Sequence, residues 1–260
     1  MIAMMMGRVI AGTMGLLFML AQADAAEIKL LASNALKSTL EEVAPQFEAA
    51  SGHKIVMTFG STGNLTASID KGTPFDLTVV GADALDSLIK RGLLVGPGRD
   101  IARSGIGVSY RKGASKPDVS TSAALKATLL AAKSISFNPR GLSGSHMLSV
   151  IDRMGIAAQV GPKLIVPAVS ASEDVAKGVA ELGITQVSEI LSHAAMGAEL
   201  AGPLPPDVQL DTVFAIAIGA KAQQPSAATV LIEFLRTPAV VPVLRAKGLE
   251  PGSVAGLRPG

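Results

Sequence analysis

The sequence predicts an α/β protein in which helices alternate with the strands of mostly parallel sheets. Short apolar runs and helical patterns alternate along the chain after residue 26, an order typical of parallel sheets covered by helices. Several apolar runs end in glycine and serine directly before a helical pattern, as in Phe59-Gly60-Ser61-Thr62-Gly63. The chain shows no repeat of fixed period and no heptad run.

Length and composition narrow the class of protein. The 260 residues allow one large domain or two lobes of about 100 residues each. The net charge of +2, from 23 basic and 21 acidic residues, does not indicate a nucleic-acid partner or an anionic membrane surface. Only 7 Phe, 1 Tyr and no Trp are present, which disfavours a stacking platform for bases or sugars. Cysteine is absent, so disulfides, thiolate metal sites and cysteine nucleophiles are excluded.

The first 25 residues have the pattern of a secretory signal peptide. Arg8 supplies the positive charge, residues 9–20 form an apolar run, and Ala23 and Ala25 form an A-x-A cleavage site. The apolar run is too short to span a bilayer. We therefore expect a mature protein that starts near Ala26 and is periplasmic; a retained membrane anchor is the alternative.

The first half of the mature chain carries four predicted strands. The spacing of Leu36, Leu40, Val43 and Phe47 predicts a helix over 35–50, which Pro45 weakens or divides. Residues 95–98 are predicted to form a loop. The other expected elements are strands over 27–32, 55–59, 75–80 and 103–110, a helix that begins at 65, and a helix over 84–91.

The second half repeats this order after a polar stretch over 111–122, the expected edge of a first lobe. A glycine and serine loop is expected over 138–146 and a linker over 203–206. The expected strands cover 135–137, 165–166, 183–187 and 212–218, and the expected helices cover 123–132, 147–154, 188–196, 227–236 and 239–246, with a short helix that begins at 172.

Two strand-to-helix junctions form the core of the predicted binding site. Ser33-Asn34 and Ser61-Thr62 each follow a strand and precede a helix, and such junctions meet at the carboxyl edge of an open sheet. A helix N-terminus presents unpaired N–H groups and the positive end of the dipole, which favours an anion. Gly60 and Gly63 allow the backbone to approach a ligand closely. The alternative is that these hydroxyls only cap the helices.

Four short motifs carry a resemblance to a known family. They are Ala32-Ser33 with Leu36, Phe59 to Leu65, Pro74-Phe75-Asp76-Leu77, and Glu233-Phe234-Leu235-Arg236-Thr237-Pro238 running to Gly248. Together they resemble the periplasmic molybdate-binding proteins of ABC importers over nearly the whole mature chain. The resemblance implies a type II periplasmic-binding-protein fold, with two lobes joined by crossing strands and an oxyanion between them. We expect lobe 1 to comprise residues 26–107 and 212–260, and lobe 2 residues 108–211.

The resemblance also implies which residues bind the anion through neutral donors. By position these ligands are Ser33, Ser61, Thr62, Gly144, Ser145, Gln186 in place of a Tyr, and a main-chain contact near Val175. Glutamine donates a hydrogen bond but reaches differently from tyrosine. No cofactor and no metal site are expected, because the three histidines are isolated in the sequence.

Charged residues near these positions keep two further alternatives open. Arg103, Arg140 and His146 favour an organic acid over a metal oxyanion, since arginine binds carboxylates in bidentate fashion. Some relatives of the family are enzymes, such as aconitate isomerase, and double-bond migration needs a proton-transfer group. The candidates for that role are His146, Glu173 and Glu189. A nucleophilic hydrolase is not expected, because the chain has no G-x-S-x-G elbow.

The sequence therefore predicts an exported, monomeric solute-binding protein. It captures a small anion, either molybdate or tungstate or a di- or tricarboxylate, and an ABC permease of the inner membrane receives it. No nucleic-acid partner is expected. The alternative function is a periplasmic isomerase of a tricarboxylic acid on the same fold.

Overall fold

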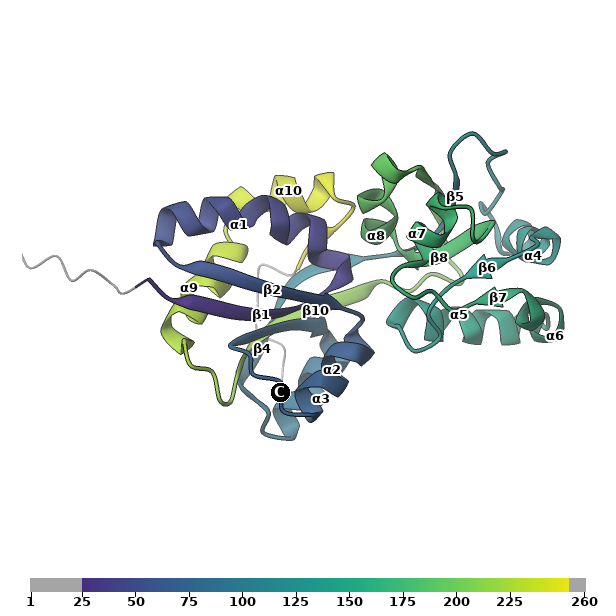
Figure 1. Cartoon of the computed structure of the whole chain (residues 1–260). Helices are drawn as coiled ribbons and strands as arrows, with labels where there is room; N and C mark the ends of the chain where they lie inside the picture. Colours follow the sequence, from purple (N-terminus) through teal and green to yellow (C-terminus); the bar gives the residue numbers. More distant parts are fainter. Residues whose placement is uncertain (1–24, 253–260) are drawn as a thin grey trace, which may run out of the picture.

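The computed structural model describes residues 25–252, which form two lobes around two separate sheets (Figure 1). The strand order is β11-β4-β10-β3-β1-β2 in the six-stranded sheet and β7-β6-β8-β5-β9 in the five-stranded sheet. The two lobes and the crossing strands of the sequence prediction are thereby confirmed. The predicted signal peptide, apart from Ala25 at its end, lies outside the described residues.

The first lobe combines both ends of the described chain. Strands β2, β1 and β3 run parallel, whereas β10 lies antiparallel between β3 and β4. Its strands are β1 (Glu27–Ser33), β2 (Lys54–Gly60), β3 (Leu77–Gly81), β4 (Leu94–Ser104), β10 (Thr212–Gly219) and β11 (Glu250–Pro251).

The alternation of side chains along β1 sets the two faces of this sheet. Leu30 joins a core with Leu40 and Phe47 of α1, whereas Leu31 packs with Leu65 and Leu85 of α2 and α3, as the two-residue period of a strand requires. One face is covered by α1 (Lys37–Ser51), α9 (Pro225–Leu235) and α10 (Val241–Ala246), and the other by α2 (Thr62–Asp70) and α3 (Ala82–Lys90).

The second lobe is one continuous segment of chain. Strand β6 pairs in parallel with β7 and β8, and β5 pairs antiparallel with β8 and β9. The strands are β5 (Ile106–Arg111), β6 (Ile135–Ser136), β7 (Leu164–Ile165), β8 (Leu182–Gln186) and β9 (Ala198–Pro203). The helices are α4 (Ser122–Ala131), α5 (Leu142–Arg153), α6 (Ala157–Val160), α7 (Ala171–Ala176) and α8 (Val187–Ser192).

The structure corrects several sequence predictions. The sheets are mixed rather than mostly parallel, because β10 and β5 enter them antiparallel. The predicted loop 95–98 is part of β4, where a shift of register against β10 accommodates Pro97 as a bulge does. The predicted strand 103–110 divides at Gly105 into β4 and β5, β9 was not predicted, and Pro45 lies inside a continuous α1.

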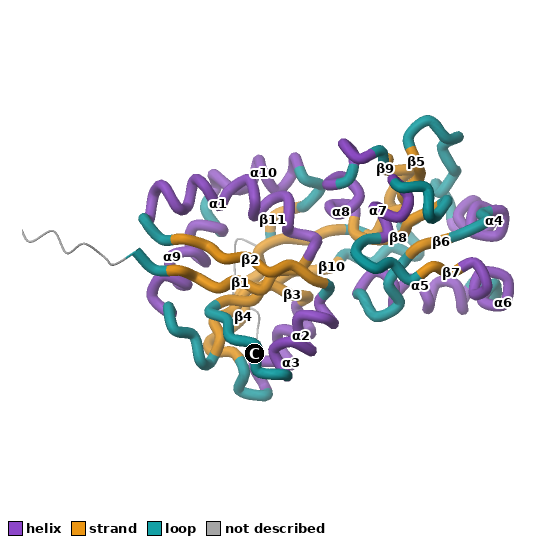
Figure 2. The backbone as a smooth tube through the Cα atoms, in the orientation of Figure 1, coloured by secondary structure: helices purple, strands orange, loops and turns teal. Residues whose placement is uncertain are grey.

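The chain crosses between the lobes twice, and both crossings lie side by side. The first is at Gly105, between β4 and β5, and the second covers residues 204–211, between β9 and β10. Figure 2 shows these strands running from one lobe to the other. The Gln209 side chain bonds to the main chain of Ile106 and Leu204, so it ties the two crossings together.

Within residues 25–252, no single helix is long and apolar enough to cross a membrane. The segments Pro225–Leu235 and Pro238–Ala246 satisfy that test only as a pair, and they are bent by 59° at the break between them.

Candidate functional site

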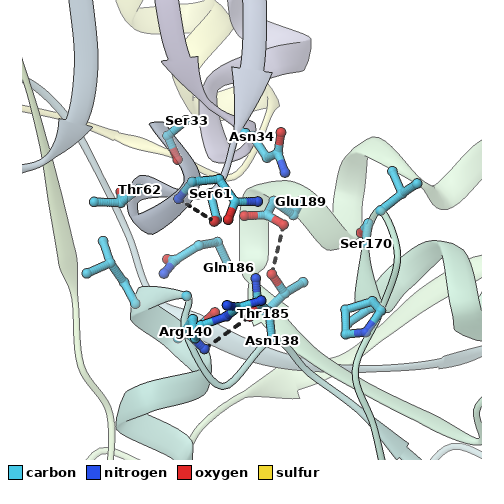
Figure 3. Close-up of a pocket in the computed structure, with 18 of the residues that line it drawn as sticks. Ser33, Asn34, Ser61, Thr62, Asn138, Arg140, Ser170, Thr185, Gln186 and Glu189 are labelled. Carbon is cyan, nitrogen blue, oxygen red and sulfur yellow. Dashed lines mark hydrogen bonds between the residues drawn. The ribbon is translucent and has the colours of Figure 1, made fainter. Parts of the chain in front are cut away.

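A cleft of about 370 Å³ lies between the lobes, where strands of both sheets end (Figure 3). The first lobe contributes the ends of β1 and β2, and the second contributes the ends of β6 and β8 and the segment before α7. The polar side chains that line it are Ser33, Asn34, Ser61, Thr62, Asn64, Asn138, Arg140, Ser143, Ser170, Thr185, Gln186 and Glu189.

Three hydroxyl groups of the first lobe each accept one main-chain hydrogen bond. Ser33 Oγ accepts from Ala35 N at 3.4 Å, and Ser61 Oγ accepts from Asn64 N at 3.2 Å. Thr62 Oγ1 accepts from Gly81 N at 3.1 Å. Within the described residues none of the three hydroxyls donates a hydrogen bond. Since a hydroxyl both accepts and donates, each keeps its hydrogen available for a ligand in the cleft.

The second lobe adds the strand-to-helix junction between β6 and α5. After β6, Asn138 Oδ1 accepts from Arg140 N at 3.0 Å and the Asn138 carbonyl oxygen accepts from Gly141 N at 2.9 Å. This turn starts α5 at Leu142, five residues earlier than predicted. The N-terminus of α5 therefore faces the cleft, an arrangement that favours an anion.

Two buried polar atoms at the cleft have no hydrogen-bond partner in the part of the chain that the structure describes. They are Ser170 Oγ and Gln186 Oε1. Gln186 donates through Nε2 to Thr212 Oγ1 at 2.9 Å. An unsatisfied buried polar atom costs about 1–3 kcal/mol, so a ligand that bonds to these atoms offsets that cost.

Glu189 is the one carboxylate among the residues that line the cleft. Thr185 Oγ1 donates to Glu189 Oε2 at 2.9 Å. Burial raises the pKa of Glu189 to about 7, and the bond from Thr185 opposes that rise in part. Among residues 25–252, no lysine, arginine or histidine forms an ion pair with it. At neutral pH this carboxyl group can therefore give or take a proton.

The remaining lining combines one cation with an apolar rim. Arg140 is the one cationic side chain among the lining residues, and it is exposed. Val166 and Val169, at the edge of the second lobe, expose 55 % and 69 % of their surface. Apolar groups beside polar ones suit a ligand with both carbon and charged oxygen atoms.

The structure brings together only part of the predicted site. Of the predicted ligands, the cleft is lined by Ser33, Ser61, Thr62 and Gln186, and of the predicted proton-transfer residues by Glu189.

The other predicted residues lie elsewhere. Ser145 and His146 line a separate hollow next to Gly81, and His146 Nε2 lies 2.7 Å from the carbonyl oxygen of Val208. Arg103 is exposed on β4, Val175 is buried in α7, and Glu173 is paired with Lys177.

Gly144 lies inside α5, and its lack of a side chain is a packing requirement. A Cβ atom there would lie 1.9 Å from the Asn138 carbonyl oxygen. Four polar residues that line the cleft were not predicted as ligands, although each lies at or near the end of a strand or the start of a helix: Asn138, Ser143, Ser170 and Thr185.

The two lobes touch beside the cleft. A Cβ atom on Gly63 of α2 would lie 3.0 Å from the Arg140 carbonyl oxygen, and one on Gly81 would lie 2.5 Å from Leu142 Cδ1. The turn that starts α5 in the second lobe therefore packs against two glycines of the first lobe. This contact between the lobes closes the cleft on one side.

Comparisons with known proteins agree with this architecture. Residues 28–250 match the family model described as bacterial extracellular solute-binding protein. The chain is 30 % identical over 241 residues to an aconitate isomerase from Pseudomonas sp, covering 90 % of this chain and 91 % of that protein. It is 28 % identical over 235 residues to the molybdate-binding protein ModA of Azotobacter vinelandii, covering 87 % and 90 %.

A solved structure supports the fold. The periplasmic molybdate-binding protein of Azotobacter vinelandii superimposes with a TM-score of 0.71 at 21 % identity, over 85 % of this chain and 98 % of that one. Such a match shows the fold of a periplasmic binding protein. The ligand has to be inferred from the residues that line the cleft.

Proposed function

The chain belongs to the family of bacterial extracellular solute-binding proteins, and we propose that it captures a small anion in the cleft between its lobes. One observation carries the proposal: Ser33, Ser61 and Thr62 each accept a main-chain hydrogen bond and keep a hydroxyl hydrogen for the ligand. Helix N-termini of both lobes add main-chain donors and the positive ends of their dipoles.

The family and the N-terminal sequence support a periplasmic setting. The pattern of residues 1–25 supports export and cleavage near Ala26. The protein acts as a periplasmic monomer, and the closed lobes deliver the anion to an ABC permease in the inner membrane.

The lining of the cleft favours an organic acid over a bare metal oxyanion. Its volume of about 370 Å³ falls in the range of small-molecule pockets, about 300–1,000 Å³. A tetrahedral oxyanion with four oxygens, such as molybdate, is smaller than this cleft. The apolar rim at Val166 and Val169 and the cation at Arg140 suit a di- or tricarboxylate. Molybdate and tungstate remain the ligands that the ModA relative suggests.

A thermal-shift panel on residues 26–260 tests this function. It compares molybdate, tungstate and sulfate with citrate, malate and the two aconitates, because a ligand that binds only the folded state raises the melting temperature. A shift with carboxylates and none with oxyanions supports the organic-acid assignment, and the reverse supports the oxyanion. The absence of any anion-specific shift contradicts the function.

A second function is favoured by Glu189 together with the 30 % identical aconitate isomerase. In this case a base removes a proton from the methylene carbon of the tricarboxylate, and the double bond migrates. The conjugate acid then returns the proton to the former alkene carbon, so atoms balance without a cofactor. Glu189 has the position and the pKa for both steps. Conversion of cis- to trans-aconitate by the purified protein, abolished in Glu189→Gln, supports this function; no conversion contradicts it.

A further inference from the structure

Glu189 places a carboxyl group, which is negatively charged when ionised, in a cleft whose other polar groups favour an anion. The neighbouring lining groups Ser33, Ser61 and Thr62 present hydroxyl hydrogens, whereas a carboxylate only accepts hydrogen bonds. Glu189 of the second lobe lines the same cleft as Ser61 and Asn34 of the first lobe (Figure 3). A ligand that fills the cleft from the hydroxyls of the first lobe to the second lobe would contact Glu189 as well.

Two negatively charged oxygens cannot lie at hydrogen-bond distance unless a hydrogen lies between them. Like charges that share a site raise the pKa of one partner until it holds a proton, and a hydrogen bond between an O–H and an ionised oxygen is short and strong. Thr185 occupies one carboxylate oxygen, Oε2. The other oxygen, Oε1, has no hydrogen bond to the described residues and is free for the ligand.

We propose that Glu189 is the specificity-determining residue of the cleft, and that it shares one hydrogen with the bound anion. An anion that carries its own O–H, such as a hydroxycarboxylate or hydrogen phosphate, supplies that hydrogen. An anion without one, such as sulfate or molybdate, binds only when Glu189 holds the hydrogen itself. This inference rests on the proposed anion-binding function and names the ligand class within it.

The electrostatic surroundings of Glu189 support the assignment. Arg140 lines the same cleft from the loop before α5 but forms no ion pair with Glu189. The pKa of the neighbouring Glu173 of α7 is lowered by Lys177, His193 and Lys37. The His193 ring bonds to the main-chain carbonyl oxygen of Glu189 rather than to its carboxyl group. The pKa of about 7 has burial as its cause, so no neighbouring charge fixes the ionised form.

Matched pairs of anions test the proposal by titration calorimetry on the mature protein. Hydrogen phosphate and sulfate are both tetrahedral, but only the first carries an O–H at about pH 8.5. Citrate and tricarballylate are both tricarboxylates that differ by one hydroxyl group. We expect the member with the hydroxyl to bind about tenfold or more tightly at that pH, the ratio that one hydrogen bond to a charged group supports.

The pH dependence gives a second measurement on the same protein. Sulfate has no proton of its own near neutrality, so we expect its affinity to rise by the order of tenfold between about pH 8.5 and pH 6. Its binding should take up close to one proton per anion at about pH 8.5, where Glu189 is ionised in the free protein, and less as the pH falls; the dependence of the heat on the ionisation enthalpy of the buffer measures this uptake.

Glu189→Gln is the decisive variant, because it keeps the shape and removes the charge and the shared proton. We expect it to bind sulfate more tightly than the parent at about pH 8.5, with no pH dependence and a phosphate-to-sulfate ratio near one. Asp152→Asn, at an exposed position at the far end of α5, is the control for net charge and should behave as the parent. Melting temperatures verify that both variants fold.

The outcomes distinguish the role of Glu189 from the anion-binding function of the cleft. Anions that bind with equal preference in the parent and in Glu189→Gln overturn the role of Glu189 and leave the anion-binding function in place. The absence of binding by every anion at either pH overturns the function, and the role of Glu189 with it.

Discussion

Gln209 and Ile106 exchange two hydrogen bonds across the two segments that join the lobes. Ile106 N donates to Gln209 Oε1 at 2.9 Å, and Gln209 Nε2 donates to the Ile106 carbonyl oxygen at 3.0 Å. The Gln209 amide thus imitates the main chain of a neighbouring strand at the first residue of β5, on the side where the pairing with β9 has ended. It connects the first crossing, at Gly105, to the second, over 204–211.

Replacement of Gln209 by alanine should loosen this connection. The Ile106 N–H loses its partner, so we expect the free energy of unfolding to fall by about 1–2 kcal/mol and amide hydrogen exchange at Ile106 to accelerate. Urea unfolding and hydrogen exchange measure the two effects. Gln159→Ala, at an exposed position in α6, is the matched control, and equal exchange rates at Ile106 in the two variants would contradict the role.

Replacement of Thr62 by valine should weaken ligand binding. Valine keeps the shape of the buried side chain but removes the hydroxyl that accepts from Gly81 N and is free to donate to the anion. We expect a loss of about 1–3 kcal/mol in binding free energy, measured by calorimetry with the anion that gives the largest thermal shift. Thr229→Val, on the exposed side of α9, should change nothing, and parental affinity in Thr62→Val would show that the site is misplaced.

Replacement of Gly63 by alanine should oppose closure of the lobes. The added methyl group would lie 3.0 Å from the Arg140 carbonyl oxygen, so the closed form becomes less favourable and the open form gains population. Apparent affinity falls in proportion to the closed fraction, and we expect a reduction of a few fold, while the melting temperature of the free protein verifies that the variant folds. Gly161→Ala, where a Cβ atom meets no neighbour within 4 Å, is the control; unaltered affinity in Gly63→Ala would mean that the contact is not formed on binding.

Glu189 should make the unliganded protein less stable as the pH rises. Its folded-state pKa of about 7 lies above the ordinary value of 4.5, so below about pH 4.5 the group is neutral in both states and costs nothing. Between about pH 4.5 and 7 the unfolded chain releases the proton first, and the free energy of unfolding falls by up to about 3 kcal/mol.

Comparison with Glu189→Gln isolates this term from other titrating groups. The variant should match the parent near pH 4 and be more stable near pH 8, as measured by urea unfolding at both values. A constant difference between the two proteins across this range would contradict the raised pKa.

The fold was largely predictable because the spacing of apolar residues along the chain indicates most of its helices and strands. Apolar runs alternate with helical faces such as Leu40, Val43 and Phe47, which all pack into the core of the first lobe. Strand direction was harder to predict, since β10 carries the same apolar sequence whichever way it enters the sheet. The segment Val95-Gly96-Pro97-Gly98 has turn residues, yet it continues β4 because the irregular pairing with β10 accommodates them.

The candidate site was predictable only at residues that stand between a predicted strand and a predicted helix. Ser33, Ser61 and Thr62 follow strands and precede helices, so their sequence context places them at a sheet edge. Gln186 and Thr212 meet across 26 residues of sequence, and Ser170 lies at the cleft through packing of the second lobe. Glu189 was a candidate from its residue type, but its half-buried position and its lack of an ion pair with the described residues depend on tertiary structure.

Strand β10 has a consequence for the order in which the protein can be assembled. It lies between β3 and β4, although 107 residues of chain separate the end of β4 from the start of β10. Until residues 212–219 have been synthesised, β3 and β4 each keep an open edge, which is a hazard for wrong pairing. The second lobe needs no such late strand. It can therefore fold while the first lobe is still incomplete, and its compact body brings the two crossings together. The cleft needs both lobes, so it cannot form before β10 has joined the first sheet.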